Sequence, residues 1–379
     1  MNLPLPTDEN ARPYLHCQRC RRDLSFGPFF GRHPDCEHQD GDGCPLETRY
    51  HAPQMAGSDA LAMGPTPLLD AGRVRARLGL PNLWLKNETC LPTWSWKDRV
   101  NRVHARLAQT WGYRRIVAVS TGNHGISLAA EARRAQLDCQ ILIHPDCPSF
   151  TKQLIRYFGA KVTPYTNDSY VQLSEMMARE KLYPAVSLPP MCGLGNAFGA
   201  EGYKSIAVEI AQALPMDRPT WVIVPTGIGD GVFGVAKGFG ELVSGGAIEW
   251  MPRIVAVQGA RCAPLVHAWK NGLDEIEPVS NPSGIALSIR EPWCGGHALN
   301  AVRASQGVAI AVTDAQILDA MARLADEGLL IDPASAATVA AAGQLAQDNI
   351  LGEDDTVVCI LSGAGVKWAG ADWLENPPI

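Results

Sequence analysis

The stretch Leu91–Arg99, which reads LPTWSWKDR, decides the fold predicted for this chain. It follows an extended run, Leu83–Glu88, and Pro92 predicts a turn between the two. The residues Asp98 to about Thr110 then predict a helix, so Lys97 lies in its first turn. Because the positive end of a helix disfavours a further cation, we expect the amine of Lys97 to lose its proton readily and to act as a nucleophile.

A second stretch, Ser120–Gly125 (STGNHG), joins a predicted strand to a predicted helix. The apolar run Ile116–Val119 is typical of a buried parallel strand, and Ile126–Ala130 predicts the start of a helix. A glycine and asparagine turn that opens a helix presents backbone N–H groups to an anion. A simple structural turn is the alternative when this stretch is considered alone.

A third stretch, Gly227–Gly231 (GIGDG), follows the predicted strand Trp221–Pro225 and precedes a helix from Val232 to about Val243. Glycines allow a backbone to approach a phosphate, and the helix start supplies donors and a favourable dipole. A carboxylate at Asp230 is unfavourable beside a phosphate unless it turns away or caps the helix. A fourth stretch, Leu361–Gly365 (LSGAG), follows the predicted strand Thr356–Ile360.

Together and in this order, the four stretches resemble motifs of pyridoxal phosphate (PLP) enzymes of the tryptophan synthase β family, and the threonine synthases among them most of all. Further segments resemble threonine synthases: Gly199–Ala207, Pro252–Gln258 and Asp332–Ala337. The resemblance runs from about residue 65 to about residue 368. It implies an α/β, two-domain fold type II PLP enzyme with parallel-rich twisted sheets, and a homodimer.

The resemblance also implies a role for each motif. Lys97 would bind PLP covalently and act as the catalytic proton shuttle, Asn123 would contact the ring oxygen, and Ser362 would hydrogen-bond the ring nitrogen. The residues expected to hold the cofactor phosphate are Gly227, Ile228, Gly229, Asp230 and Gly231. The residues expected to bind the amino-acid substrate, mainly its carboxylate, are Ser120, Thr121, Gly122, Asn123 and His124, with Trp94 shaping the pocket.

Two tryptophans beside the lysine depart from the family pattern. Trp94 stands where the family usually has Gly, and Trp96 where it usually has Phe. A large indole at position 94 is expected to narrow the substrate pocket, unless it is a packing substitution outside that pocket. The phosphate loop departs too, with Asp230 for the usual Gly or Ser and Gly231 for the usual Thr or Asn.

The expected reaction is that of a PLP-dependent lyase of amino-acid metabolism, similar to threonine synthase, on an amino acid with a β or γ leaving group. One alternative is β-elimination or β-replacement, as in dehydratases, diaminopropionate ammonia-lyases or cysteate synthases. A second is a non-catalytic binding protein that kept the fold. The presence of Lys97, Asn123 and Ser362 together argues against a non-catalytic protein.

Composition narrows the class of protein. The chain has 379 residues, 46% of them hydrophobic, and a formal charge of -6, so we expect a large core and no nucleic-acid partner. No signal peptide or apolar stretch long enough to span a bilayer is visible, so no membrane association is expected. Of the 11 cysteines, four lie near the N-terminus and the other seven are scattered, which indicates a reducing cytoplasm.

The four N-terminal cysteines predict a zinc site. The predicted ligands are Cys17, Cys20, Cys36 and Cys44. Paired thiolates can close a tetrahedral structural site that replaces a small hydrophobic core. Because the interval before Cys44 is long, His33 or His38 is an alternative to Cys36, and reduced, unliganded cysteines are the other interpretation.

These features predict three parts. Residues 1–55 form a small Cys-rich module, residues 56–104 and 196–379 a large PLP domain, and residues 105–195 a small α/β domain. The alanine-rich run Ala334–Ala346 is predicted to be a packed amphipathic helix.

Overall fold

A computed structural model describes residues 13–30, 35, 46–50, 63–165, 173, 175–177, 179–186, 198–214 and 218–368. The chain divides into two compact units. The first, here called the N-terminal unit, comprises residues 1–63 and 97–203, and the C-terminal unit comprises residues 64–96 and 204–379. The division falls directly before Lys97, because the helix that starts there packs within the N-terminal unit. The predicted three-part division stays a prediction.

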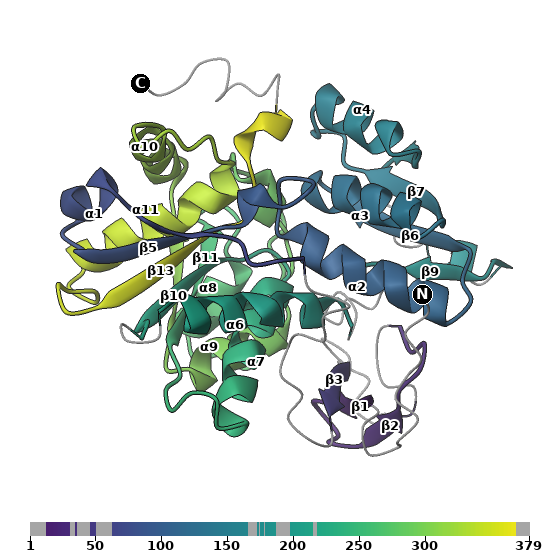
Figure 1. Cartoon of the computed structure of the whole chain (residues 1–379), viewed down its shortest axis with the longest axis horizontal. Coiled ribbons are helices and arrows are strands. Elements are labelled where there is room, and N and C mark those ends of the chain that lie inside the picture. Colours follow the sequence, from purple (N-terminus) through teal and green to yellow (C-terminus); the bar gives the residue numbers. More distant parts are fainter. Residues whose placement is uncertain are drawn as a thin grey trace. The chain divides into compact units, whose positions relative to one another are not determined.

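The C-terminal unit is built on a six-stranded sheet with the order β12-β11-β10-β13-β5-β4. Its strands are β4 (Leu68–Asp70), β5 (Asn82–Asn87), β10 (Trp221–Pro225), β11 (Arg253–Gly259), β12 (Val308–Val312) and β13 (Thr356–Leu361). All neighbouring pairs are parallel except β4 with β5. Figure 1 shows β5, from early in the chain, beside β13 from its end.

Helices cover both faces of this sheet, which is why β10 and β13 are buried along their whole length. Figure 1 shows α10 and α11 on one side and α6, α7 and α9 on the other. The helices of this unit are α1 (Arg73–Leu78), α6 (Lys204–Ala213), α7 (Asp230–Ser244), α8 (Pro264–Lys270), α9 (Gly296–Ala304), α10 (Asp314–Ala325) and α11 (Pro333–Gln347). Short 3-10 turns are η2 (Glu88–Cys90), η4 (Leu287–Ile289) and η5 (Gly365–Trp368).

The alanine-rich helix α11 is not amphipathic, contrary to the prediction. Every residue from Pro333 to Ala342 is buried. Small side chains allow this helix to lie against the strands β10 to β13 and beneath α10, so it has no solvent face over that length.

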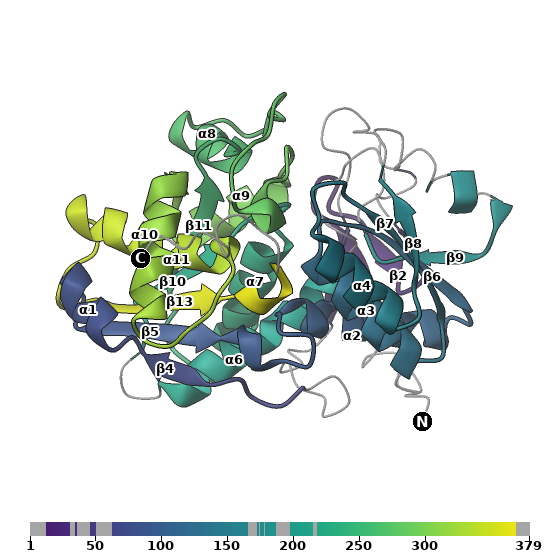
Figure 2. The ribbon, with the colours of Figure 1, turned by 90° about the horizontal axis from the view of Figure 1, so that it is seen from above.

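The N-terminal unit contains a parallel sheet with the order β8-β7-β6-β9. Its strands are β6 (Arg115–Ser120), β7 (Asp138–Ile143), β8 (Lys161–Pro164) and β9 (Leu182–Pro184). The helices α2 (Lys97–Thr110), α3 (Asn123–Arg134) and α4 (Ser149–Tyr157) lie side by side, as Figure 2 shows, and η3 (Gly199–Tyr203) packs on α2.

A small antiparallel sheet, β2-β1-β3, belongs to the same unit. Its strands are β1 (Pro13–Cys17), β2 (Asp23–Ser25) and β3 (Leu46–Tyr50). Leu15, Cys17 and Leu46 are buried with Val103 of α2 and Phe198. The small sheet therefore shares a hydrophobic core with α2.

The predicted α/β class with parallel-rich sheets is confirmed, whereas a separate Cys-rich module is not. In the described part of the chain, no helix combines the length and hydropathy needed to span a bilayer.

Candidate active site

Three predicted motifs of the C-terminal unit lie at one edge of its sheet. The glycine-rich loop Gly227–Gly231 follows β10, Ser362 follows β13, and the segment Glu88–Trp96 follows β5. Since β10, β13 and β5 are parallel neighbours, these three loops leave the same carboxyl edge. Ligands of open α/β sheets bind outside this edge.

The glycine-rich loop is shaped for an anion. Gly229 has a φ of 111°, and a Cβ placed there would lie 2.5 Å from Cβ of Ala298, so only glycine fits. Within the described residues, the N–H groups of Gly227, Ile228 and Gly229 have no backbone or side-chain acceptor. These donors and the start of the 15-residue helix α7 suit the phosphate of PLP.

Asp230, the residue that departs from the family pattern, is the first residue of α7. Its Oδ1 lies 3.7 Å from Nε2 of His297, whose side chain is fully buried. Neither ring nitrogen of His297 has a hydrogen-bond partner in the described structure. The Asp230 carboxylate therefore lies beside the His297 imidazole, on the side of the loop that faces α9.

Gly231 and Trp96 also depart from the family pattern, and the two departures are coupled by a close contact. A Cβ added at Gly231 would lie 2.4 Å from Cη2 of the Trp96 indole. Trp96 is buried, and its backbone N–H donates to the carbonyl of Ser362 at 2.9 Å. The larger aromatic ring therefore occupies the space that a side chain at position 231 would need.

Trp94 has a left-handed backbone, with a φ of 58°. A side chain is strained in that conformation, which is the physical reason for a glycine at this position in similar sequences. The carbonyl of Trp94 accepts from the Ala364 N–H at 2.9 Å and from Nζ of Lys367 at 2.8 Å. The indole is 39% exposed, so packing inside the C-terminal unit does not account for its size.

Ser362 is buried, and its hydroxyl lies 3.3 Å from the hydroxyl of Ser335 in α11. Ser335 in turn donates to Oδ1 of Asp332 at 2.8 Å. A buried hydroxyl at the carboxyl edge of β13 suits a partner for the ring nitrogen of PLP.

Lys97 is the first residue of α2 and belongs to the N-terminal unit. Its Nζ lies 5.6 Å from the ring centroid of Tyr203 in η3. An aromatic face at this distance attracts the ammonium and orients the side chain.

The second anion loop of the sequence follows β6, the strand that β7 and β9 flank in the sheet of the N-terminal unit. The hydroxyl of Ser120 accepts from the N–H of Gly122 at 3.0 Å and of Gly125 at 2.8 Å. Gly122 has a φ of 150° and precedes α3. Ser120 thus orders the loop, and among the described residues its hydroxyl proton has no acceptor.

Asn123 and His124 open helix α3. The carbonyl of His124 accepts from Nδ2 of Asn101 at 3.2 Å, and its Nε2 donates to the carbonyl of Ala185 at 2.6 Å. A carbonyl only accepts, so the proton of this imidazole is on Nε2. His124 is held by the Asn101 side chain at its carbonyl and by the Ala185 carbonyl at its ring, which fixes the first turn of α3.

The predicted zinc ligands are only partly described. Cys17 ends β1, and its Sγ accepts from the N–H of Cys20 at 3.5 Å. Burial raises the pKa of the Cys17 thiol. The predicted ligands Cys36 and Cys44, and the alternatives His33 and His38, lie outside the described residues. Among those that are described, no group of three or more His, Cys, Asp or Glu residues could hold a metal.

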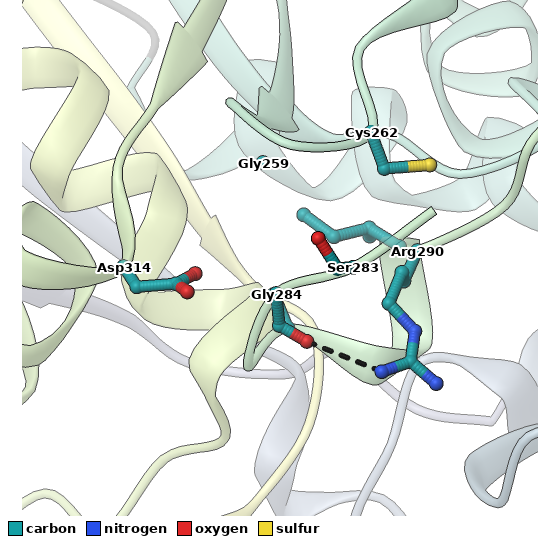
Figure 3. A pocket seen from close by; sticks show the side chains of 8 residues that line it. Gly259, Cys262, Ser283, Gly284, Arg290 and Asp314 are labelled. Carbon is teal, nitrogen blue, oxygen red and sulfur yellow. Dashed lines mark hydrogen bonds between the residues drawn. The ribbon is translucent and has the colours of Figure 1, made fainter. Parts of the chain in front are cut away.

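A small pocket that the sequence did not indicate lies at the carboxyl ends of β11 and β12 (Figure 3). Its polar lining includes Cys262, Arg290 and Asp314. Nη1 of Arg290 donates to the Gly284 carbonyl at 3.5 Å, and Sγ of Cys262 donates to the carbonyl of Glu291 at 3.1 Å. Burial raises the pKa of Cys262 to about 11, so this thiol is a hydrogen-bond donor and a poor nucleophile.

Comparison with known proteins agrees with this geometry. Residues 60–363 match the family model described as pyridoxal-phosphate dependent enzyme. The chain belongs to this family.

Its sequence is similar to curated threonine synthases. It is 35% identical to that of Methanocaldococcus jannaschii over 81% of this chain and 76% of the relative. It is 32% identical to that of Mycobacterium bovis over 91% and 94% of the two chains.

Among solved structures, the fold is similar to threonine deaminase isoform 2 from Solanum lycopersicum. The TM-score is 0.68 at 21% identity, over 82% of this chain and 88% of that one. An L-serine ammonia-lyase from Rhizomucor miehei aligns with a TM-score of 0.66 at 21% identity, over 79% and 94%.

These findings confirm that the chain is a fold type II PLP-dependent lyase similar to threonine synthases. The roles of individual residues stay predictions.

Proposed function

We propose that this enzyme acts on a short amino acid with a leaving group at Cβ and uses O-phosphohomoserine poorly. One observation carries this proposal. Trp94, three residues before Lys97, is strained at a φ of 58° and keeps an indole that is 39% exposed. Unfavourable backbone conformations persist mainly where function requires them. An indole beside the reactive lysine removes space that a longer, phosphorylated side chain needs.

Lys97 would bind PLP and, as the free amine, take the proton from the substrate Cα. When bound, PLP would supply an electron sink for the pair released at that carbon, so that a leaving group at Cβ could depart. The donors of Gly227–Gly231 would hold the cofactor phosphate, and Ser362 would hold the ring nitrogen.

The loop Ser120–His124 would bind the substrate carboxylate, with Asn123 also contacting the cofactor's ring oxygen. Ser120 supports this role in two ways. Its oxygen orders the loop through two N–H groups, and its proton is left for an anion. A loop held in advance in its binding shape loses little entropy when substrate binds.

The second candidate is threonine synthesis itself, from O-phosphohomoserine. The 35% identity to a curated threonine synthase favours it. In that reaction Lys97 would move protons at both Cα and Cβ before phosphate leaves and water adds.

A substrate panel separates the two candidates. We expect kcat/KM to be higher for β-substituted amino acids than for O-phosphohomoserine, with released phosphate, ammonia and keto acid measured together. Trp94→Gly should shift the ratio towards the longer substrate, while Trp94→Phe, the matched control, keeps most of the preference. If O-phosphohomoserine is the best substrate and yields threonine, the second candidate is correct.

We also propose that a structural zinc is bound by Cys17, Cys20, Cys36 and Cys44, with His33 or His38 as alternatives to Cys36. The turn after β1 supports this. Arg21 has a φ of 61°, and its N–H donates to the carbonyl of Cys17 at 3.0 Å. The Cys20 N–H already points at Sγ of Cys17. Donors of this kind stabilise a thiolate once a metal displaces its proton.

Metal analysis of protein purified without added metal should give about one zinc per chain. The double variant Cys17→Ser/Cys20→Ser should lose it, while Cys90→Ser, which changes an exposed cysteine, should keep it. Full zinc content in the double variant would refute this ligand set.

We further propose a homodimer in the cytoplasm, in keeping with the family resemblance and with the scattered cysteines of the sequence. Light scattering on the purified enzyme should give about twice the chain mass of 40.8 kDa.

A further inference from the structure

Lys367, in the turn η5 that follows β13, is a buried lysine that binds the backbone of the segment before Lys97. The residue is only 1% exposed. Its Nζ donates to the carbonyl oxygen of Trp94 at 2.8 Å and to that of Thr93 at 3.3 Å. An ammonium group only donates and a carbonyl only accepts, so the direction of both hydrogen bonds is fixed. Because burying an ammonium is costly without acceptors, these two carbonyls stabilise Lys367 in return.

The same loop is also bonded to the end of β13 through its backbone. The N–H of Ala364 donates to the Trp94 carbonyl at 2.9 Å, and Ser95 forms an antiparallel bridge with Gly363. Backbone groups of many sequences can make these contacts. The two bonds from Lys367, in contrast, require a long cationic side chain at this position.

Hydrogen bonds at both peptide groups of Trp94 hold its left-handed backbone. Its N–H donates to the carbonyl of Leu91 at 2.8 Å, and its own carbonyl accepts from Ala364 and Lys367. A residue with a side chain avoids a φ of 58° and keeps it only where its surroundings impose it. The indole is 39% exposed, so side-chain packing supplies only part of that constraint. A charged donor makes the stronger hydrogen bond, which singles out Lys367 among these partners.

We propose that Lys367 is a positioning residue for substrate selection, whose ammonium holds Trp94 in the left-handed conformation that fixes the place of the indole. The inference rests on the proposed role of Trp94 in excluding a longer, phosphorylated substrate. Once its carbonyl is released, Trp94 can relax to a negative φ, which side chains favour. That rotation turns the Cα–Cβ bond, and the indole moves with it. Lys367 thus acts on selectivity through Trp94.

The test uses Lys367→Met, whose side chain has a similar length but no charge and no N–H donor. In the crystal structure of this variant, φ at Trp94 should be negative. Selectivity is the ratio of kcat/KM for the best β-substituted amino acid to kcat/KM for O-phosphohomoserine. It should fall about tenfold, the size expected for losing a hydrogen bond from a charged group. In a Trp94→Gly background, where glycine accepts a positive φ and no indole is present, Lys367→Met should leave the ratio unchanged.

Lys204→Met is the matched control. Lys204 is a buried lysine of α6, and its Nζ donates to Oε2 of Glu241 in α7 at 2.7 Å. This variant should lower the free energy of unfolding in urea but keep the wild-type ratio. If Lys367→Met does not fold, Lys367→Gln, which keeps a neutral N–H donor, should change the ratio in the same direction by a smaller factor.

A positive φ at Trp94 in the Lys367 variant would overturn the inference, as would a wild-type ratio. An equal fall of the ratio with and without the indole would overturn it too, because Lys367 would then act by another route. A wild-type enzyme that prefers O-phosphohomoserine would instead refute the proposed function, and the substrate panel shows this before any variant is made.

Discussion

Two loops of this enzyme join a parallel strand to a helix through a glycine with positive φ, yet their backbone donors differ. In the N-terminal unit, the hydroxyl of Ser120 already accepts from Gly122 and Gly125. In the C-terminal unit, the corresponding hydroxyl, Thr226, donates back to the carbonyl of Val224 at 2.9 Å and satisfies no donor of the loop. In the first loop, the Ser120 side chain accepts hydrogen bonds from the loop's own N–H groups. The second loop leaves several N–H groups for a ligand.

The difference indicates which anion each loop suits. A phosphate offers many acceptor oxygens and can bind several backbone N–H donors at the start of a helix. A carboxylate offers fewer acceptor oxygens. A loop in which some N–H groups already donate to a side chain of the loop therefore suits a carboxylate better. The difference supports the proposal that Gly227–Gly231 hold the cofactor phosphate and Ser120–His124 the substrate carboxylate.

The largest expected effect comes from filling each cap glycine. Gly229→Ala adds backbone strain and a clash with Ala298, and should lower the free energy of unfolding by about 2–5 kcal/mol. The added methyl of Gly122→Ala comes no closer than 3.5 Å to a neighbour, so only strain of about 1–2 kcal/mol is expected.

Urea denaturation measures both costs, and titration with PLP measures cofactor affinity. We expect Gly229→Ala alone to weaken PLP binding strongly. If Gly122→Ala lost as much PLP affinity as Gly229→Ala, the proposed roles of the two loops would be wrong.

The second prediction concerns the Gly231 and Trp96 pair. Gly231→Thr should clash with the indole and reduce PLP binding, and Trp96→Phe should restore it in the double variant. A double-mutant cycle should give a coupling energy of about 1–3 kcal/mol in urea denaturation. Strictly additive effects would show that the two departures from the family pattern are unrelated.

The third prediction sharpens the role of Ser120. Ser120→Ala leaves two buried N–H groups without their acceptor, which should cost about 1–3 kcal/mol of stability and raise KM for the amino acid. Affinity for PLP should stay close to that of the wild-type enzyme. The control, Thr226→Val, changes the other loop's hydroxyl and should leave KM unchanged. A lower PLP affinity in Ser120→Ala would contradict the assignment.

The smallest effect is expected at Cys147, whose Sγ lies 3.7 Å from a Cβ built at Gly122. Burial raises the pKa of this thiol to about 12 from its ordinary 9.0. The folded state therefore keeps a neutral thiol that the unfolded chain would ionise. Its contribution to stability is complete below pH 9 and is lost as pH rises towards 12.

Stability measured from pH 7 to 11 should fall less steeply in Cys147→Ala than in the wild-type protein. Cys90→Ser, which alters an exposed cysteine, provides the baseline. Identical slopes for Cys147→Ala and wild type would show that this thiol is not shielded.

The sequence predicted the elements that carry the motifs. The strand Trp221–Pro225 matches β10, and the helix predicted from Asp98 to about Thr110 is α2, which begins one residue earlier. These predictions succeeded because long apolar runs and glycine turns specify local structure by themselves.

The contacts between motifs could not be predicted, because a single sequence does not show which distant residues meet. Trp96 and Gly231, or Ser335 and Ser362, come together only through the order of strands in the sheet. The left-handed backbone at Trp94 had a visible signal, since similar sequences usually have glycine there. The exposed side expected for the alanine-rich helix was wrong because alanine suits a fully buried helix as well as an amphipathic one.

The most direct test of the account is the identity of the lysine that binds PLP. Borohydride reduction of the purified enzyme, followed by peptide mapping, should place the pyridoxyl group on Lys97. The buried lysines Lys86, Lys204 and Lys367 are already bonded to carboxylates or backbone carbonyls and should be unlabelled. Label on any of these three, with none on Lys97, would contradict the account.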